Sequence, residues 1–471
     1  MLTTAYTVGD SSTFWQALRR ALRGEQLDYT QGSITTAIGL LSIPMVLEMI
    51  MESLFGLVDV FFVAHLGADA VAAVGLTESL LTPVFAVALG LSIGSTAIVA
   101  RRIGESRPEE ASIAAAQAIL VAVGVSAVVG VAGFLFASDL LRLMGATESI
   151  VRIGSGYSRT IMSTSGVIFF LFVINAVFRG AGDASIAMRS LWLANIINIL
   201  LNPCLILGLG PFPEMGVTGS AVGSSIGRGA GVAYQLWMLS SGRSRVKLHL
   251  AAIRPNFEIM AKLIRLSIGG MFQHLVNVAS WIALVRMAAY FGSAAIAGYT
   301  LAIRIIIFGV LPSWGMSNAA ATLVGQNLGA KRPDRAEKSV WIAASLNATF
   351  LGVLGLVFII WARPIVSLFT METEVVNMAA TTLRFVSYCY LFYGFGLVIV
   401  QSFNGAGDTY TPTMINLFCY WAWQLPLAWW LAFHTSFGVS GIFLAISIAE
   451  TTLAVLGFVA FRRGTWKTRQ V

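Results

Sequence analysis

Long apolar segments separated by short polar ones dominate the pattern of this chain. A helix needs about 20 mostly apolar residues to cross the hydrocarbon core of a bilayer. Twelve segments meet this length, near 37–63, 70–100, 111–137, 154–178, 186–208, 217–240, 264–291, 295–325, 337–361, 379–403, 410–433 and 438–461. The pattern therefore predicts an all-α membrane protein with twelve transmembrane helices.

The second half of the pattern repeats the first at a nearly constant offset. Phe178–Asp183 (FRGAGD) matches Phe403–Asp408 (FNGAGD) 225 residues later, and Gly216–Gly219 matches Gly438–Gly441 at an offset of 222. Each copy contains six predicted spans, and an even number returns the chain to its starting side. The copies therefore share one orientation, which predicts two pseudo-symmetric six-helix lobes of the kind that transporters use.

The repeat and the polar segments define the expected domain organisation. The N-lobe covers residues 34–241 and the C-lobe residues 258–461, joined by a linker at 242–257 and flanked by tails at 1–33 and 462–471. Of the 30 lysines and arginines, 22 fall on the side of the termini and 4 on the opposite side. Cytoplasmic loops carry the excess of these residues. Both tails and the linker are therefore expected to be cytoplasmic.

Composition excludes several classes of protein. Apolar residues make up 57% and charged residues 11% of the chain, against about 45–50% and 25% in soluble domains, which excludes a soluble enzyme of this length. The net charge of +8 comes from scattered loop residues, so no nucleic-acid partner is expected. The three cysteines form no metal or disulfide pattern. No phosphate-binding loop or nucleophile–base pair is present, so neither ATP use nor enzymatic activity is expected.

Three acids in the first predicted span are the leading functional candidates. Glu48, Glu52 and Asp59 form one narrow stripe on a helix, and ionisable groups at membrane depth are costly enough to indicate function. The equivalent positions of the second repeat carry no carboxylate and are Gln273, Asn277 and Leu284. We therefore expect the first lobe to bind a coupling cation, H⁺ or Na⁺. The alternative is that an acid of the stripe is neutral or pairs with an arginine, Arg228 or Arg159.

Other polar and aromatic residues are candidates for the same sites. Asn198 and Asn202 lie one turn apart before Pro203, and their amide oxygens suit a hard cation; an interhelical hydrogen-bond ladder is the alternative. In the second lobe Gln273, His274 and Asn277 are candidates for the substrate cavity. Trp421 is a candidate for an aromatic wall against flat organic cations.

The chain resembles the multidrug and toxic compound extrusion (MATE) transporters over residues 34–461. The resemblance rests on Pro44 with Leu57–Asp59, on Arg179–Asp183, on Asn198–Asn202, and in the second half on Val324–Ala330 and Asn404–Asp408. It implies antiport, in which a cation enters while an amphiphilic, often cationic, organic compound leaves. It further implies that Asp59 is the protonation or sodium site, supported by Asn198 and by a hydroxyl in the sixth span such as Ser224.

Two departures from the family pattern concern the coupling ion. Asn202 stands where one prokaryotic branch usually has an aspartate, and Asn277 lies near the second-lobe glutamate of another branch. The hypothesis that follows is that Glu48 or Glu52 supplies part of the missing charge. No cofactor is expected beyond H⁺, or Na⁺ bound at Asp59 and Asn198.

The remaining expectations concern partners, location and rival functions. The expected partners are a small organic substrate, the coupling cation and membrane lipid, and the expected form is a monomer in the bacterial inner membrane. The first alternative is a flippase or exporter of a lipid-linked or endogenous metabolite with the same architecture. A membrane protein that senses or binds without transport is the second alternative.

Overall fold

The computed structural model describes residues 6–7, 14–23, 27–249 and 253–471, and it is almost entirely helical. The predicted tail 1–33 and linker 242–257 fall partly outside these residues. A short helix, α1 (Phe14–Leu22), and two paired two-residue strands, β1 (Tyr6–Thr7) and β2 (Leu27–Asp28), precede the helical body. The N-lobe then contains α2 (Ile34–Ala64), α3 (Ala68–Gly104), α4 (Pro108–Leu143), α5 (Glu148–Ser163), α6 (Ser165–Ala181), α7 (Ala184–Leu207) and α8 (Val217–Ser240).

The C-lobe repeats this order of helices. It contains α9 (Phe257–Ala289), α10 (Ser293–Gly329), α11 (Pro333–Ser367), α12 (Thr373–Ser387), α13 (Tyr390–Gly405), α14 (Tyr410–Leu417), the π-helix η2 (Phe418–Gln424), α15 (Leu425–Phe433) and α16 (Val439–Arg462), followed by a 3₁₀ turn, η3 (Thr465–Thr468). Helices α3 and α10 begin and end at positions that are 225 residues apart, and α8 and α16 begin and end at positions that are 222 residues apart. Even an unusual backbone position repeats, since Ser106 and Lys331 have φ of 60° and 58°. The predicted duplication is confirmed.

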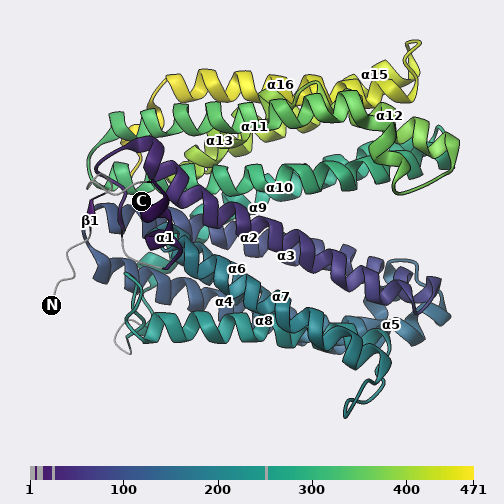
Figure 1. The fold of residues 1–471 in the computed structure, drawn as a ribbon, viewed down its shortest axis with the longest axis horizontal. Helices are drawn as coiled ribbons and strands as arrows, with labels where there is room; N and C mark the ends of the chain where they lie inside the picture. Colours follow the sequence, from purple (N-terminus) through teal and green to yellow (C-terminus); the bar gives the residue numbers. More distant parts are fainter. Residues whose placement is uncertain (1–5, 8–13, 24–26, 250–252) are drawn as a thin grey trace.

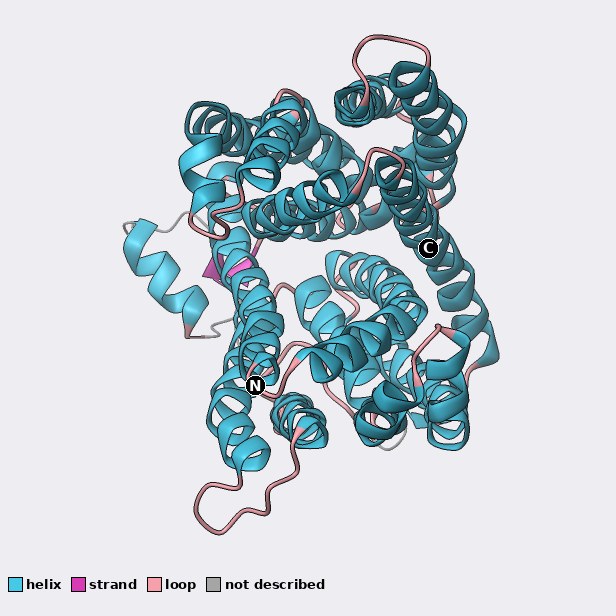
Figure 2. Cartoon of the chain, turned by 90° about the vertical axis from the view of Figure 1, so that its right-hand side faces the viewer, coloured by secondary structure: helices cyan, strands magenta, loops and turns pink. Residues whose placement is uncertain are grey.

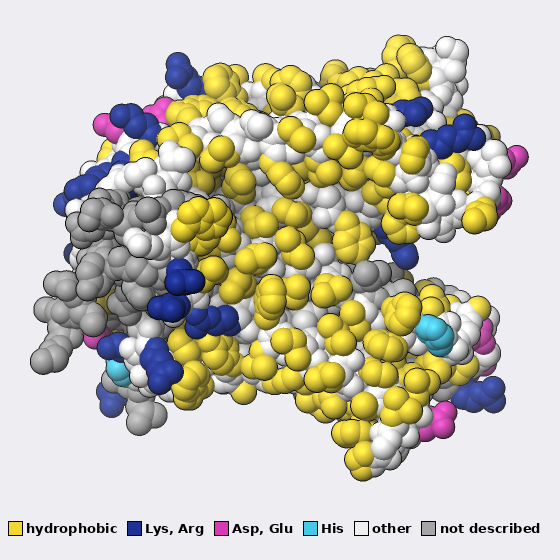
Figure 3. All heavy atoms as spheres, viewed as in Figure 1, with side chains coloured by type: hydrophobic (Ala, Val, Ile, Leu, Met, Phe, Trp, Pro, Cys, Tyr) yellow, Lys and Arg dark blue, Asp and Glu magenta, His cyan; other side chains and the backbone are white. Residues whose placement is uncertain are grey.

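The helices are long and apolar enough for a multi-pass membrane protein. Within the described residues, eight single helices qualify as membrane spans by length and composition. Two bent pairs, α5 with α6 at 41° and α12 with α13 at 58°, raise this number to ten. Helix α8 and the stretch α14–η2–α15 occupy the two remaining predicted segments. In Figure 3 hydrophobic side chains cover the middle of the molecule, and most lysines and arginines lie near its ends.

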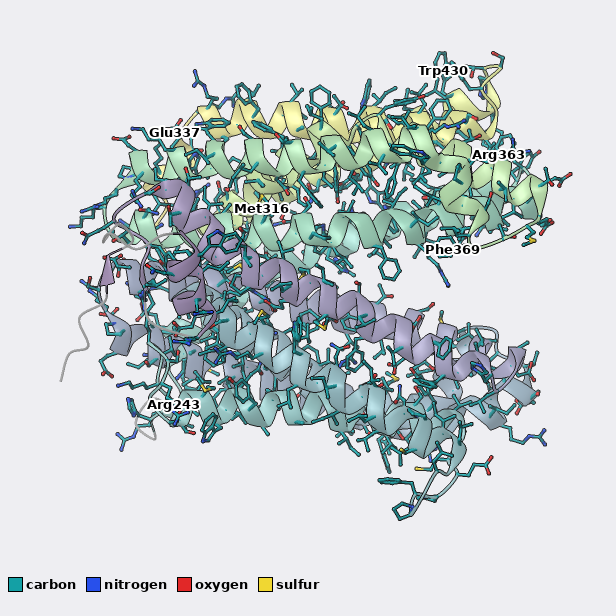
Figure 4. The ribbon with its side chains drawn as sticks, in the orientation of Figure 1. Arg243, Met316, Glu337, Arg363, Phe369 and Trp430 are labelled. Carbon is teal, nitrogen blue, oxygen red and sulfur yellow. The ribbon has the colours of Figure 1, made fainter. Side chains whose placement is uncertain are left out.

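The two lobes meet at one end of the molecule and diverge at the other. Figure 1 shows β1 and the C-terminus at the closed end, which we call the terminal end, and a separation of the lobes toward the opposite, open end. Figure 2, viewed from the open end, shows the helices end-on in two groups. Figure 4 labels Glu337 and Arg243 near the terminal end and Arg363 and Phe369 near the open end.

Small residues bring the lobes into direct backbone contact. A Cβ atom added at Gly315 of α10 would lie 2.6 Å from the backbone nitrogen of Val46 on α2. The repeat-related Gly90 of α3 would meet the carbonyl of Ser267 on α9 at 2.6 Å. Both contacts lie in the helix halves nearer the terminal end, so glycine permits close packing there. The interface between the lobes follows the pseudo-symmetry of the repeat.

Candidate functional site

The carboxylate of Asp59 on α2 is held by three polar side chains of the N-lobe. Asn202 Nδ2 donates to Asp59 Oδ1 at 2.6 Å, and Asn198 Nδ2 donates to the same oxygen at 3.1 Å. The Ser224 hydroxyl on α8 lies 2.9 Å from Oδ1 and 2.8 Å from Oδ2. We call these four residues the Asp59 cluster. The structure thus brings together the aspartate, both asparagines and the serine that the sequence analysis singled out.

Glycines on α8 allow these side chains to converge. A Cβ at Gly223 would lie 2.4 Å from Asn202 Oδ1, and one at Gly227 would lie 2.6 Å from the carbonyl of Ala194 on α7. The close approach buries both asparagines completely and leaves Ser224 2% exposed. Asp59 itself keeps partial exposure. The cluster is therefore rigid on the α7–α8 side and accessible on the side of Asp59.

The donors of the cluster suit a carboxylate that can exchange a proton. The two amides present nitrogen, not oxygen, to Asp59, whereas hard cations require several oxygen ligands. In this arrangement the carboxylate and the Ser224 hydroxyl face each other, and Asn198 Oδ1 is buried without a hydrogen-bond partner in the described part of the chain. Within the described residues no group of three or more His, Cys, Asp or Glu is placed to hold a metal ion. Protonation of Asp59 requires only that Ser224 rotate from donor to acceptor.

Glu48, the first acid of the stripe, is buried in an ion pair. It is 1% exposed, and its Oε1 lies 2.5 Å from Arg179 Nη1 of α6 and 3.0 Å from Asn175 Nδ2. Oε2 has no partner within the described residues. This arrangement matches the alternative of an acid paired with an arginine, although the arginine is neither Arg228 nor Arg159.

Glu52 lies between Glu48 and Asp59 and makes no ion pair or hydrogen bond within the described part of the chain. The charges that reach it are those of Arg228 and Arg179. Arg228 on α8 lies over the ring of Phe55, with its guanidinium carbon 4.4 Å from the ring centroid. Glu52 is therefore the acid of the stripe that has a cationic neighbour but no direct partner in the described part of the chain.

A cavity of about 330 Å³ lies between the lobes and is lined by both. Its wall carries three carboxylates, Glu48, Glu52 and Glu450, against one guanidinium, Arg179, and one imidazole, His274. The predicted cavity residues Gln273, His274 and Asn277 all line it. Aromatic side chains complete the wall, namely Phe172, Trp314, Tyr393 and Tyr420. The cavity thus combines an apolar aromatic surface with an excess of acids.

The expected place of Trp421 in this wall is wrong. Trp421 is 44% exposed, does not line the cavity, and donates through Nε1 to the carbonyl of Val276 at 3.1 Å. The cause is the π-helix Phe418–Gln424, in which each residue turns less than in an α-helix. The side-chain directions around the helix axis are shifted as a result, so that Tyr420 lines the cavity and Trp421 lies outside it.

Sequence reasoning missed the acid of the C-lobe. Glu450 lies in the middle of α16, is 8% exposed, and lines the cavity. The C-lobe therefore also carries an intramembrane carboxylate, at a position outside the repeat of the stripe. The stripe and its equivalents at the offset of 225 lie in the first and seventh predicted spans, whereas Glu450 lies in the last predicted span. The signal was present, because an isolated glutamate within an apolar span is itself a functional indication.

A polar network around Glu48 was missed as well. Asn175 Oδ1 accepts hydrogen bonds from Ser190 Oγ at 3.1 Å and Gln235 Nε2 at 2.5 Å. Arg179 belongs to the FRGAGD motif, whose second copy has Asn404 at the equivalent position. Its backbone carbonyl accepts from Thr322 of the C-lobe at 3.2 Å. The network therefore connects the stripe to the contact between the lobes.

Comparisons with known proteins agree with this geometry. The family model MatE matches residues 44–204 and 271–430. The "Probable multidrug resistance protein YoeA" of Bacillus subtilis is 26% identical over 93% of this chain and 96% of its own length. The "FAD transporter" of Shewanella oneidensis is 24% identical, covering 87% and 90% respectively. The solved "outward-facing conformation of a multidrug resistance MATE family transporter" superposes with a TM-score of 0.87 and 25% identity over 98% of this chain and all of that chain.

Proposed function

Because the chain belongs to the MatE family of multidrug efflux transporters, we propose that it exports amphiphilic organic cations in exchange for protons. The lobes alternate between an outward-open and an inward-open arrangement around the central cavity. The Asp59 cluster takes up and releases the coupling proton, and the cavity holds the compound. The chain acts as a monomer in the bacterial plasma membrane.

The observation that carries this proposal is the set of hydrogen-bond donors around the Asp59 carboxylate. The carboxylate accepts three different donors and has no arginine or lysine partner within the described residues. A proton on Oδ2 reverses the hydrogen bond with Ser224, whose hydroxyl must then accept, and so alters the contact of α2 with α8. Proton binding is thereby linked to the position of α2, the helix that also contacts α10 of the other lobe.

The orientation follows from the distribution of basic residues. With the terminal end on the cytoplasmic side, the cleft in Figure 3 opens outward. Asp59 then lies in the outward half of α2, partly exposed, where protons enter from outside. Glu52 is the next titratable group on the same face, two turns toward the cavity. We assign it the role of coupling proton binding at Asp59 to the charge of the cavity.

The rival substrate class is an anionic metabolite, for which the relative named as an FAD transporter is the argument. The cavity carries three carboxylates, and its one arginine is already paired with Glu48. Phosphate recognition requires free arginines or lysines. The charge of the cavity therefore favours a cationic compound over a flavin nucleotide or a lipid-linked diphosphate.

The test is export from proteoliposomes of purified protein. Ethidium is loaded as the transported cation, and a pH gradient and a Na⁺ gradient are applied separately. We expect the pH gradient alone to drive export, Asp59→Asn to abolish the driven component, and Asp69→Asn, which changes an exposed acid, to leave it intact. Export driven by Na⁺, or driven export that persists in Asp59→Asn, contradicts the proposed coupling. Export of FAD in preference to ethidium supports the rival substrate class.

A further inference from the structure

The C-lobe half of the cavity contains a carboxylate that forms no ion pair with any cation in the described part of the chain. Glu450 forms no ion pair within the described residues, and its Oε1 accepts from the Tyr420 hydroxyl at 3.2 Å. Its Oε2 is buried and has no hydrogen-bond partner in the same part of the chain. A buried carboxylate left in this state is costly. Such a group therefore indicates a ligand that comes and goes.

The repeat shows that this charge is specific to the C-lobe. At the offset of 222 that relates α8 to α16, the position of Glu450 corresponds to Arg228. Arg228 lies over the ring of Phe55, and its charge reaches Glu52 and Asp59 of the N-lobe. The two lobes thus carry opposite charges at equivalent places. The N-lobe supplies its acids with a cation of its own, whereas the C-lobe leaves its acid without one.

The side chains around Glu450 fit the apolar body of an organic cation. Tyr420, Tyr393 and Trp314 line the same cavity, and aromatic faces attract cations. Tyr420 reaches this position through the π-helix Phe418–Gln424, a local irregularity of the kind that often accompanies functional sites. A volume of about 330 Å³ accommodates a compound with several rings.

We infer that Glu450, with Tyr420 positioning it, binds the cationic centre of the exported compound and selects cations over anions of the same shape. This inference rests on the proposed function, since it assigns the substrate contact of the same transporter. Glu450 is the specificity-determining residue, and Asp59, on another helix of the other lobe, is the coupling residue. The two roles are therefore separable by mutation.

The experiment compares two probes of similar shape and opposite charge, tetraphenylphosphonium and tetraphenylborate. Their binding to the purified full-length protein in detergent is measured by equilibrium dialysis, without any gradient. Wild type is expected to bind the phosphonium more tightly, and Glu450→Gln to weaken that binding by about 30-fold or more, as for loss of one partner of a buried charge pair. Glu450→Asp, which keeps the charge, is expected to restore part of the affinity.

Three further variants make the result decisive. Glu374→Gln, at an exposed position, serves as the matched control and is expected to bind like wild type. Tyr420→Phe is expected to reduce phosphonium affinity less than Glu450→Gln, because it removes only the hydroxyl. Asp59→Asn is expected to bind the phosphonium normally while failing in driven export, so failure of the coupling proposal is distinguishable from failure of this one. Phosphonium binding that is unchanged in a folded Glu450→Gln variant, or equally weakened for the borate, overturns the inference.

Discussion

The ion pair of Glu48 and Arg179 provides a quantitative test of what a buried charge pair contributes to the stability of the N-lobe at the cavity wall. The side chains are 2% and 10% exposed, and their closest atoms are 2.5 Å apart. Arg179→Met leaves the Glu48 carboxylate buried with Asn175 as its remaining partner. Removal of one partner of such a pair costs about 3–5 kcal/mol, because the other charge stays buried without compensation.

Replacing both charges is expected to cost much less than either single change suggests. Glu48→Leu combined with Arg179→Met removes the stranded charge, and an apolar pair of similar volume is often neutral in stability. The assay is thermal unfolding of the purified protein in one detergent, arranged as a double-mutant cycle. Arg142→Met serves as the control, since its pair with Glu148 at 2.9 Å lies at the surface, 49% and 77% exposed. The reasoning is refuted if Arg179→Met and Arg142→Met have the same melting temperature. It is also refuted if the double variant is no more stable than the less stable of its two single variants.

Three further outcomes are expected from the packing. Gly315→Leu places a side chain against the backbone of Val46 at 2.6 Å, so it should abolish export or prevent folding, whereas Gly124→Leu, with open space around it, should retain wild-type export in the same vesicles. Trp466→Ala removes a fully buried ring that stacks on Phe461 at 4.6 Å between centroids; a loss of about 3–5 kcal/mol should appear as a lower melting temperature. Trp421→Phe should leave ethidium export unchanged, because its ring lies outside the cavity; a clear loss of export would show that this surface takes part in transport.

The span pattern and the repeat were predictable because both depend on local sequence. Apolar segments of sufficient length must be helical in lipid, where every backbone polar group needs an internal partner. Each of the twelve predicted segments coincides with helical structure. The convergence of Asp59, Asn198, Asn202 and Ser224 followed from their membrane depth together with the family resemblance. Spacing along one helix could not have placed α8 against α7.

The errors arose where backbone geometry or long-range pairing decides the outcome. The side of the helix on which Trp421 lies depends on a π-turn, which the helix propensities of its residues do not predict. The partner of Glu48 is Arg179, 131 residues away, and was not among the arginines considered. Glu450 was not predicted because it lies in the last span, outside the stripe of the first span and the repeat of that stripe. Hydropathy encodes neither a local π-turn nor the pairing of side chains on different helices, whereas Glu450 was visible in the sequence as an isolated acid in an apolar span.

The opposite charges at Arg228 and Glu450 bear on how a duplicated transporter can exchange two different cations. Two identical lobes would offer each cation two equivalent sites, and export of the compound would not require entry of the proton. Here the N-lobe holds acids beside its own arginine, and the C-lobe holds one acid with a free oxygen. On the proposed assignments the proton and the compound occupy different lobes, joined through Glu52 and the Glu48–Arg179 pair at the contact between them. A variant that reverses the asymmetry, Arg228→Glu with Glu450→Arg, should therefore lose tetraphenylphosphonium binding together with proton-driven export, and normal coupling in that variant would contradict the division of roles.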